Sequence, residues 1–244
     1  MKKKILAIDI GNTNITSAVF SGNSIISKKK IPTQCCSAYK KILIGGINEI
    51  IISSVVPLAM ARMVCEINRV LKKKVTILGK DRMVPIKNLY KIRSEVGQDR
   101  LVNAFGARAI YGSPSVIIDF GTAITFDVVS KKGEYLGGLI LPGIEMGLKS
   151  LYERTALLPK VDLKPAKSIV GRDTVNSMRG GILFGYGAMC DGLALAYRRL
   201  LGAKTKIIAT GGNARIIKRY SGAIQIVDED LTLKSLALLA SAST

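Results

Sequence analysis

The sequence predicts an α/β protein made of two duplicated halves, each a mixed β-sheet flanked by helices. The buried-type strand Glu49 to Val55, a helix from Pro57 and a returning strand, Lys74 to Leu78, form a βαβ order typical of partly parallel sheets. The opening I-D-I-G-N-T-N of residues 8–14 recurs as I-D-F-G-T-A-I at residues 118–124, which indicates duplication. With 244 residues, 48% of them hydrophobic, the chain suffices for two packed halves, expected at 1–112 and 113–244.

The first half begins with a three-stranded meander. Apolar β-type runs flank the polar turn Gly11 to Asn14, so residues 4–10 and 15–20 form a hairpin, and residues 24–31 add a third strand. Pro57 suits the first turn of an amphipathic helix that extends to about Leu71. A further helix is expected from Asp99 to Tyr111, where Gly112-Ser113-Pro114 ends it.

The second half repeats this order and then adds helices. Ser115 to Asp119 is a buried-type strand that ends in a carboxylate, and Phe120 to Ala123 forms a small turn. The remaining expected strands cover 124–129, 133–141, 206–209 and 223–227, and the expected helices cover 143–152, 174–201, a short segment after Gly211-Gly212, and the C-terminal segment from Leu231.

The complete absence of histidine excludes several kinds of active site. No Ser-His or Cys-His nucleophile is available, so acid and base work must fall to carboxylates, Lys, Tyr or Cys. The four cysteines, at 35, 36, 65 and 190, show no C-x-x-C spacing and no zinc-site pattern. This cysteine usage indicates a reducing cytosol.

The formal charge of +20 admits nucleic acid, anionic lipid or anionic small substrates as partners. The lysines are scattered, and aromatic residues make up only 5% of the chain, with no Trp, so no base-stacking platform is evident. The apolar run Ile5 to Ile8 is too short for a signal peptide or a membrane span. We therefore expect a cytoplasmic protein with a lysine-rich surface and neither nucleic acid nor membrane as its main partner.

Chemistry is expected at the two Asp-x-Gly turns. Each turn places a carboxylate, a glycine backbone and, in both halves, a threonine hydroxyl at one hairpin tip, a set that suits phosphate and hydrated Mg²⁺. One such turn is equally typical of an ordinary hairpin. Two turns of the same design, with Thr210-Gly211-Gly212-Asn213 before a helix, instead favour a nucleotide site.

These elements resemble the phosphate 1, phosphate 2 and adenosine motifs of the acetate and sugar kinase, heat-shock chaperone and actin superfamily. Within it, the chain resembles type III pantothenate kinase from its first strand to its last helix. The matching motifs, in order, are D-I-G-N-T-N at 9–14, G-Q-D-R-L-V-N at 97–103, I-D-F-G-T-A-I-T-F-D at 118–127, G-G-L-I-L-P-G at 137–143, T-A-L-L-P at 155–159, G-R-D-T at 171–174, A-T-G-G-N-A at 209–214 and D-E-D-L-T-L-K at 228–234.

The resemblance implies two actin-like, ribonuclease H-like halves and the ATP-dependent phosphorylation of pantothenate, the first step of coenzyme A biosynthesis. It implies Asp99 as the general base, a sensible role where positioning matters more than basicity. From the residues alone, Asp99 equally suits a helix cap. The implied pantothenate-binding residues are Tyr90, Gly97, Gln98, Asp99, Arg100 and Thr174; the implied ATP-binding residues are Asp9, Ile10, Gly11, Asn12, Thr13, Asn14, Ile15, Thr16, Thr122, Gly211 and Gly212.

The resemblance also implies ions and a partner copy. Asp9 would hold Mg²⁺ through phosphate or water, Asp119 would coordinate K⁺ or NH₄⁺, and the long helix after residue 173 would pack in a homodimer. The chain departs from the family pattern at Ile92 and Arg93, where Asn-Pro is usual, and at Arg179-Gly180, where Gln-Ser is usual. The first departure affects the loop before the catalytic Asp, and the glycines suggest close helix packing.

Two other functions stay open on the sequence. A regulatory or accessory protein of the same fold would use the basic surface to bind nucleic acid or a partner, but such a descendant is expected to lose Asp9, Asp99 or Asp119, and all three are present. A kinase of the same fold for another small hydroxylated substrate is kept open by the altered loop from Tyr90 to Gly97. A substrate panel separates the two kinases.

Overall fold

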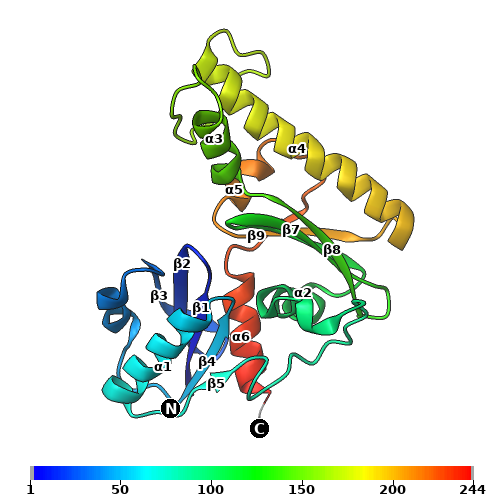
Figure 1. The fold of residues 1–244 in the computed structure, drawn as a ribbon. Coiled ribbons are helices and arrows are strands. Elements are labelled where there is room, and N and C mark those ends of the chain that lie inside the picture. Colours follow the sequence, from blue (N-terminus) through cyan, green and yellow to red (C-terminus); the bar gives the residue numbers. More distant parts are fainter. Residues whose placement is uncertain (1–2, 243–244) are drawn as a thin grey trace. The chain divides into compact units, whose positions relative to one another are not determined.

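The computed structural model describes residues 3–242 and contains two five-stranded mixed sheets, each in its own compact unit (Figure 1). One unit comprises Met1–Ile110 with Asp230–Thr244, and the other comprises Tyr111–Glu229. The two residues at each end of the chain lie outside the described part.

The first unit is built on the sheet order β3-β2-β1-β4-β5. β1 pairs antiparallel with β2 and parallel with β4, and β4 pairs parallel with β5. The carboxyl ends of β1 and β4 therefore meet at the same sheet edge, the usual place for ligand sites in open α/β sheets. The strands are β1 (Lys4–Ile10), β2 (Asn14–Ser21), β3 (Ser24–Pro32), β4 (Glu49–Ser54) and β5 (Thr76–Ile77).

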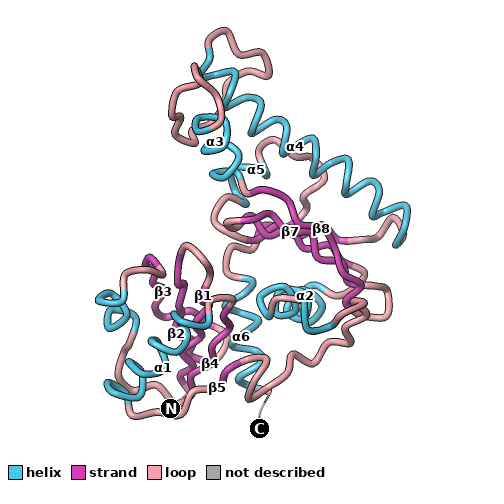
Figure 2. Tube along the Cα trace, in the orientation of Figure 1, coloured by secondary structure: helices cyan, strands magenta, loops and turns pink. Residues whose placement is uncertain are grey.

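Helices cover both faces of this sheet. Alternation along β1 sends Leu6, Ile8 and Ile10 into a core with α1 (Pro57–Leu71) and the 3₁₀ helix η1 (Cys36–Ile42). α6 (Leu231–Ser241) contacts β1, β2 and β4, and α2 (Gln98–Tyr111) joins α6 through a 2.7 Å hydrogen bond from Thr232 Oγ1 to Asn103 Oδ1. Between β5 and α2 the chain is almost entirely loop, interrupted by the short η2 (Arg93–Glu95) (Figure 2).

The division of the chain differs from the expected boundary at residues 112 and 113. The first segment of the first unit ends at Ile110, and a second segment begins at Asp230. The last helix therefore belongs with the first sheet and not with the second half. The reason is burial: Leu231, Leu233, Leu236 and Leu239 of α6 are at most 3% exposed. Gly106 of α2 admits this packing, because a Cβ there would lie 1.6 Å from Ser235 Oγ.

The second unit repeats the topology of the first. Its sheet order is β10-β9-β6-β7-β8, in which β6 to β10 hold the positions that β1 to β5 hold in the first sheet. The β6–β7 and β7–β8 pairs are antiparallel, and the β6–β9 and β9–β10 pairs are parallel. This confirms the duplication. The strands are β6 (Ser115–Phe120), β7 (Ala123–Val129), β8 (Tyr135–Pro142), β9 (Lys206–Thr210) and β10 (Ile226–Val227).

Three helices pack on the core of the second unit: α3 (Ile144–Glu153), α4 (Thr174–Leu201) and α5 (Ala214–Lys218). α4 is the long yellow helix of Figure 1. Its Asp191 carboxylate accepts hydrogen bonds from Ser221 Oγ at 2.5 Å, Ala223 N at 2.9 Å and Gly222 N at 3.2 Å. These bonds tie the α5–β10 loop to α4.

The expected close packing at the glycine pair of α4 is absent within the described part of this chain. A Cβ on Gly181 would meet nothing within 4 Å, and one on Gly180 would make an ordinary 3.4 Å contact with Ser168 O. Gly185 and Gly192 are similarly open. Over residues 3–242, no helix is both long and apolar enough to cross a membrane.

Candidate active site

The first candidate element is the hairpin tip between β1 and β2. Gly11 N donates to Asn14 O at 3.0 Å and closes the tip, leaving Asn12 and Thr13 exposed. Asp9 lies one residue before the end of β1, in register with Thr16 of β2 and Ser53 of β4. Equal register places these three side chains on one face of the sheet. Ser53 is fully buried, and its Oγ has no hydrogen-bond partner among the described residues.

The second element is Asp99, in the first turn of α2. Its Oδ1 accepts a 2.8 Å hydrogen bond from Arg100 N. Burial raises the pKa of the Asp99 carboxyl, although the Arg100 N–H and the charge of its guanidinium oppose that shift. A raised pKa makes the carboxylate a stronger proton acceptor than an exposed aspartate.

Packing brings Asp99 to the edge that carries the hairpin tip. Val55 follows β4, and its N donates to Ile10 O at 3.1 Å. A Cβ built on Gly97 would lie 3.7 Å from Val55 Cγ1 and 2.5 Å from Asp99 Oδ1. Asp99 therefore adjoins the chain segment that pairs with the end of β1, and the lack of a side chain at Gly97 makes room for its carboxylate.

The other expected substrate residues of this unit lie on α2 and on the loop that precedes it. Arg100 is 8% exposed, and the Gln98 side chain fills the space against Gly79. Tyr90 lies in the loop before η2, where its N donates to Asn88 Oδ1 at 2.9 Å. At the altered family positions, Ile92 is 48% exposed and Arg93 begins η2.

In the second unit, a row of oxygen-bearing side chains crosses three strands. Asp119 of β6 is in register with Thr210 of β9 and Thr125 of β7. Thr125 Oγ1 donates to Asp127 Oδ2 at 2.9 Å, and the buried Asp127 also accepts from Tyr135 OH at 2.9 Å. Thr125 and Thr210 are not among the expected binding residues, although the first lies in I-D-F-G-T-A-I-T-F-D and the second in A-T-G-G-N-A; only the strand register identifies them as neighbours of Asp119.

Two glycines pack closely against the Asp119 turn. Gly211 has φ +87°, and a Cβ there would lie 2.5 Å from Asp119 Oδ1 and 2.7 Å from the Phe120 carbonyl carbon. A Cβ on Gly143 would lie 2.0 Å from Thr122 O. The second unit thus gathers Asp119, Thr122 and the turn of Gly211, with Gly212 following, at one edge of its sheet.

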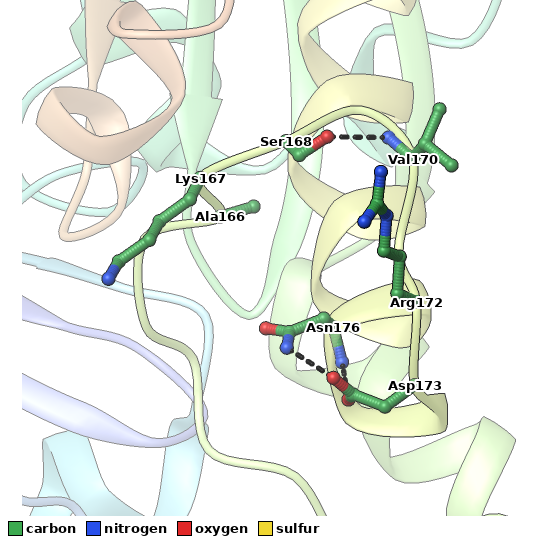
Figure 3. Close-up of a pocket in the computed structure, with 7 residues that line it drawn as sticks. All are labelled: Ala166, Lys167, Ser168, Val170, Arg172, Asp173 and Asn176. Atoms are coloured by element: carbon green, nitrogen blue, oxygen red, sulfur yellow. Dashed lines mark hydrogen bonds between the residues drawn. The ribbon is translucent and has the colours of Figure 1, made fainter.

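Thr174 is the first residue of α4. Its neighbours Asp173 and Asn176 line a pocket of about 360 Å³ (Figure 3). Asp173 caps the helix by accepting a 2.9 Å hydrogen bond from Asn176 N. This backbone bond, together with a second bond from the Asn176 side chain, lowers the pKa of the Asp173 carboxyl. Figure 3 shows the Lys167 side chain directed away from the other labelled residues. The lining residues are Ala166, Lys167, Ser168, Val170, Arg172, Asp173 and Asn176.

The expected site residues are divided between the two units. Asp9 to Thr16, Tyr90 and Gly97 to Arg100 belong to the first unit, and Thr122, Asp119, Thr174, Gly211 and Gly212 to the second. Among the described residues, no cluster of three or more Cys, Asp and Glu side chains suits a metal ion.

Comparison with known proteins identifies the family. Residues 5–196 match the family model described as type III pantothenate kinase. The chain belongs to the type III pantothenate kinase family. Relatives named type III pantothenate kinase include one from Desulforapulum autotrophicum, 38% identical over 97% of this chain and 96% of the relative, and one from Listeria monocytogenes, 36% identical over 96% of each. The chain is accordingly a kinase, and ATP and pantothenate are the substrates that this family implies.

Solved structures support the fold. A structure titled conserved putative Baf family transcriptional activator from Campylobacter jejuni aligns with a TM-score of 0.64 at 20% identity, covering 97% of this chain and 98% of the other. A ROK family glucokinase from Streptomyces griseus aligns at 0.51 with 13% identity, covering 98% and 100%. These likenesses agree with two duplicated actin-like halves.

Proposed function

We propose that the protein transfers the γ-phosphoryl group of ATP to the primary hydroxyl of pantothenate, the first step towards coenzyme A, and that Asp99 accepts the hydroxyl proton. The observation that carries the assignment is the half-buried Asp99 carboxylate next to Gly97, a glycine that lies against Val55 at the same sheet edge as the hairpin tip. Its raised pKa suits proton acceptance. The O–H bond of pantothenate breaks as its oxygen bonds phosphorus, and ADP departs.

Asp9 and the Gly11–Thr13 tip hold the phosphates in this proposal, with Ile10 and Asn14 to Thr16 framing the tip. The donor set suits Mg²⁺, because one carboxylate with neighbouring hydroxyls leaves room for water and phosphate ligands. The fully buried Ser53 hydroxyl beside Asp9, which lacks a partner among the described residues, supports a polar ligand on that face. Bound Mg²⁺ would neutralise phosphate charge.

Arg100, Gln98, Gly97 and Tyr90 bind pantothenate around the base, and Thr174 adds a hydroxyl contact. A guanidinium is a natural partner for the pantothenate carboxylate. The pocket lined by Asp173 and Asn176, the neighbours of Thr174, supports a polar substrate group near the start of α4.

The second unit supplies nucleotide and cation contacts. Thr122, Gly211 and Gly212 contact ATP, since close backbone approach needs the bare glycines. Asp119 coordinates K⁺ or NH₄⁺, and the threonine hydroxyls in register on either side fit such an ion, because hard cations take oxygen ligands.

The functional form is a cytoplasmic homodimer that packs along α4. Gly181, Gly185 and Gly192 offer open backbone on that helix, and Leu195 is 52% exposed. Small residues allow a second helix to approach closely, which supports this surface as the dimer contact.

The testing experiment incubates the purified protein with ATP, Mg²⁺ and pantothenate and measures the product mass, with K⁺, NH₄⁺ or Na⁺ in turn. We expect phosphopantothenate only with K⁺ or NH₄⁺. Asp99→Asn should remain folded and lose turnover, and a near-normal rate would remove Asp99 from the mechanism. Product with Na⁺ alone would remove the cation requirement.

The exposed Ile92 and the η2 turn at Arg93 favour one second candidate, a kinase for another small hydroxylated substrate. A panel of hydroxylated acids and amides, assayed under the same conditions, separates it from pantothenate kinase. A substrate turned over faster than pantothenate would support it.

A further inference from the structure

The residue after β3, Thr33, contacts the phosphate-loop tip at two points. Thr33 is 6% exposed, and its Oγ1 donates to Gly11 O at 2.7 Å. Its backbone N donates to Thr13 O at 3.0 Å. Both bonds fix carbonyl groups of the Gly11–Thr13 tip. In the proposed function this tip holds the ATP phosphates.

A third bond holds Thr33 itself. Tyr39 of η1 is 2% exposed, and its hydroxyl donates to Thr33 O at 2.8 Å. The ring packs in the same core as Ile10 and Ile15, the residues that flank the tip. Thr33 and Tyr39, which we call the Thr33 clamp, therefore connect the tip to the rigid core of the first unit.

The direction of these bonds determines which groups of the tip face outwards. In a trans peptide the C=O of one residue and the N–H of the next point in opposite directions, and both peptides concerned are trans. With the Gly11 carbonyl turned towards Thr33, the N–H group of Asn12 points away from Thr33. Outward backbone N–H groups are the donors that bind phosphate oxygens.

We propose that the Thr33 clamp is a positioning device for phosphoryl transfer, which holds the Gly11–Asn12 peptide with its N–H towards the ATP phosphates. Gly11 makes such a device necessary, because glycine turns its peptide more freely than any other residue. Without the Thr33 hydroxyl, the Gly11 carbonyl can rotate outwards and present negative charge to the phosphates. This role rests on the proposed function, and neither residue touches the reacting atoms.

The test compares Thr33→Val with a matched control, Thr205→Val. Thr205 of the second unit is 1% exposed, and its Oγ1 donates to a glycine carbonyl, Gly202 O, at 2.6 Å, just before β9 begins and so at the opposite end of that strand from Gly211. Both variants lose one buried hydroxyl bond of the same kind. A merely structural role at Thr33 therefore predicts the same modest loss of melting temperature in both and the same kinetics.

We expect Thr33→Val to raise the KM for ATP about tenfold or more, the effect of losing a charge-assisted hydrogen bond, with the KM for pantothenate unchanged. Thr33→Ser should restore the wild-type value, and Tyr39→Phe should give a smaller rise. ATP titration by calorimetry, without pantothenate, should show the same weakening. Equal ATP affinity in Thr33→Val and Thr205→Val would overturn the proposal.

Failure of the clamp and failure of the proposed function are distinguishable. If the wild type binds ATP but makes no phosphopantothenate, the function is wrong, while the calorimetric comparison still decides the clamp. If Thr33→Val does not fold, the two conservative variants decide it. Wild-type ATP affinity in Tyr39→Phe together with weakened affinity in Thr33→Ser would then overturn the proposal.

Discussion

Replacing Gly97 by Ala should displace the Asp99 carboxylate, the proposed base, without disturbing the fold. The added Cβ would lie 2.5 Å from Asp99 Oδ1, whereas ordinary contacts begin near 3.4 Å. The oxygen must therefore move by about 0.9 Å, the difference between these distances, and its 2.8 Å bond from Arg100 N must lengthen or break. The neighbouring Val55 Cγ1 would be at an ordinary 3.7 Å, and the φ angle of Gly97 is not positive.

A misplacement of about 1 Å in a reacting group costs on the order of 10²-fold in rate. We expect Gly97→Ala to lower kcat for pantothenate phosphorylation by about that factor, with the KM for ATP and the melting temperature near wild type. The assay couples ADP release to NADH oxidation and confirms the product by mass.

The matched control is Gly45→Ala, in a loop of the same unit. A Cβ at Gly45 would meet nothing within 4 Å, and its φ is not positive either. This variant should keep wild-type kcat. A kcat for Gly97→Ala within about threefold of the control would refute the reasoning. The loss of transition-state stabilisation would then be smaller than the about 1.4 kcal/mol that corresponds to a tenfold change in rate.

Three further predictions concern titration and packing. Activity should fall with decreasing pH through the raised pKa of Asp99, and so at higher pH than an exposed aspartate would give, because protonation removes the base; an initial-rate profile flat to about pH 4, near the ordinary aspartate pKa, would contradict this. Burial alone would raise the pKa of Asp191, but the hydrogen bonds that the carboxylate accepts lower this pKa below its ordinary value. These bonds therefore stabilise the fold fully above the pKa of the unfolded state, and this stabilisation is lost as pH falls through the pKa of the folded state. Urea unfolding should show Asp191→Asn less stable by about 1–3 kcal/mol at neutral pH, with the difference shrinking in acid; a constant difference would argue against the carboxylate. Gly106→Ala should cost about 1–3 kcal/mol or more through overpacking, and Ser235→Gly should recover part of it; additive losses in the double variant would contradict direct α2–α6 contact.

Local patterns sufficed for most elements of this fold. The helix from Pro57 to Leu71 and the long helix from Thr174 to Leu201 have the bounds that the sequence predicted. For the first helix the signal is local, because Pro suits a first helical turn. The recurring Asp-x-Gly turns likewise indicated the duplicated sheets. η1 was not foreseen, since its 3₁₀ turns carry a short polar segment with no clear period.

The sequence by itself determined the family, the chemistry available without histidine and the residues of the two turns, because those properties reside in residue identity and short-range order. Tertiary structure alone decided the rest. It placed α6 on the first sheet, because this helix, with its buried leucines, contacts β1, which lies more than 200 residues earlier in the chain. It also set Ser53 beside Asp9, Thr210 beside Asp119 and Thr33 against Gly11, because strand register and side-chain hydrogen bonds between distant segments leave no local pattern.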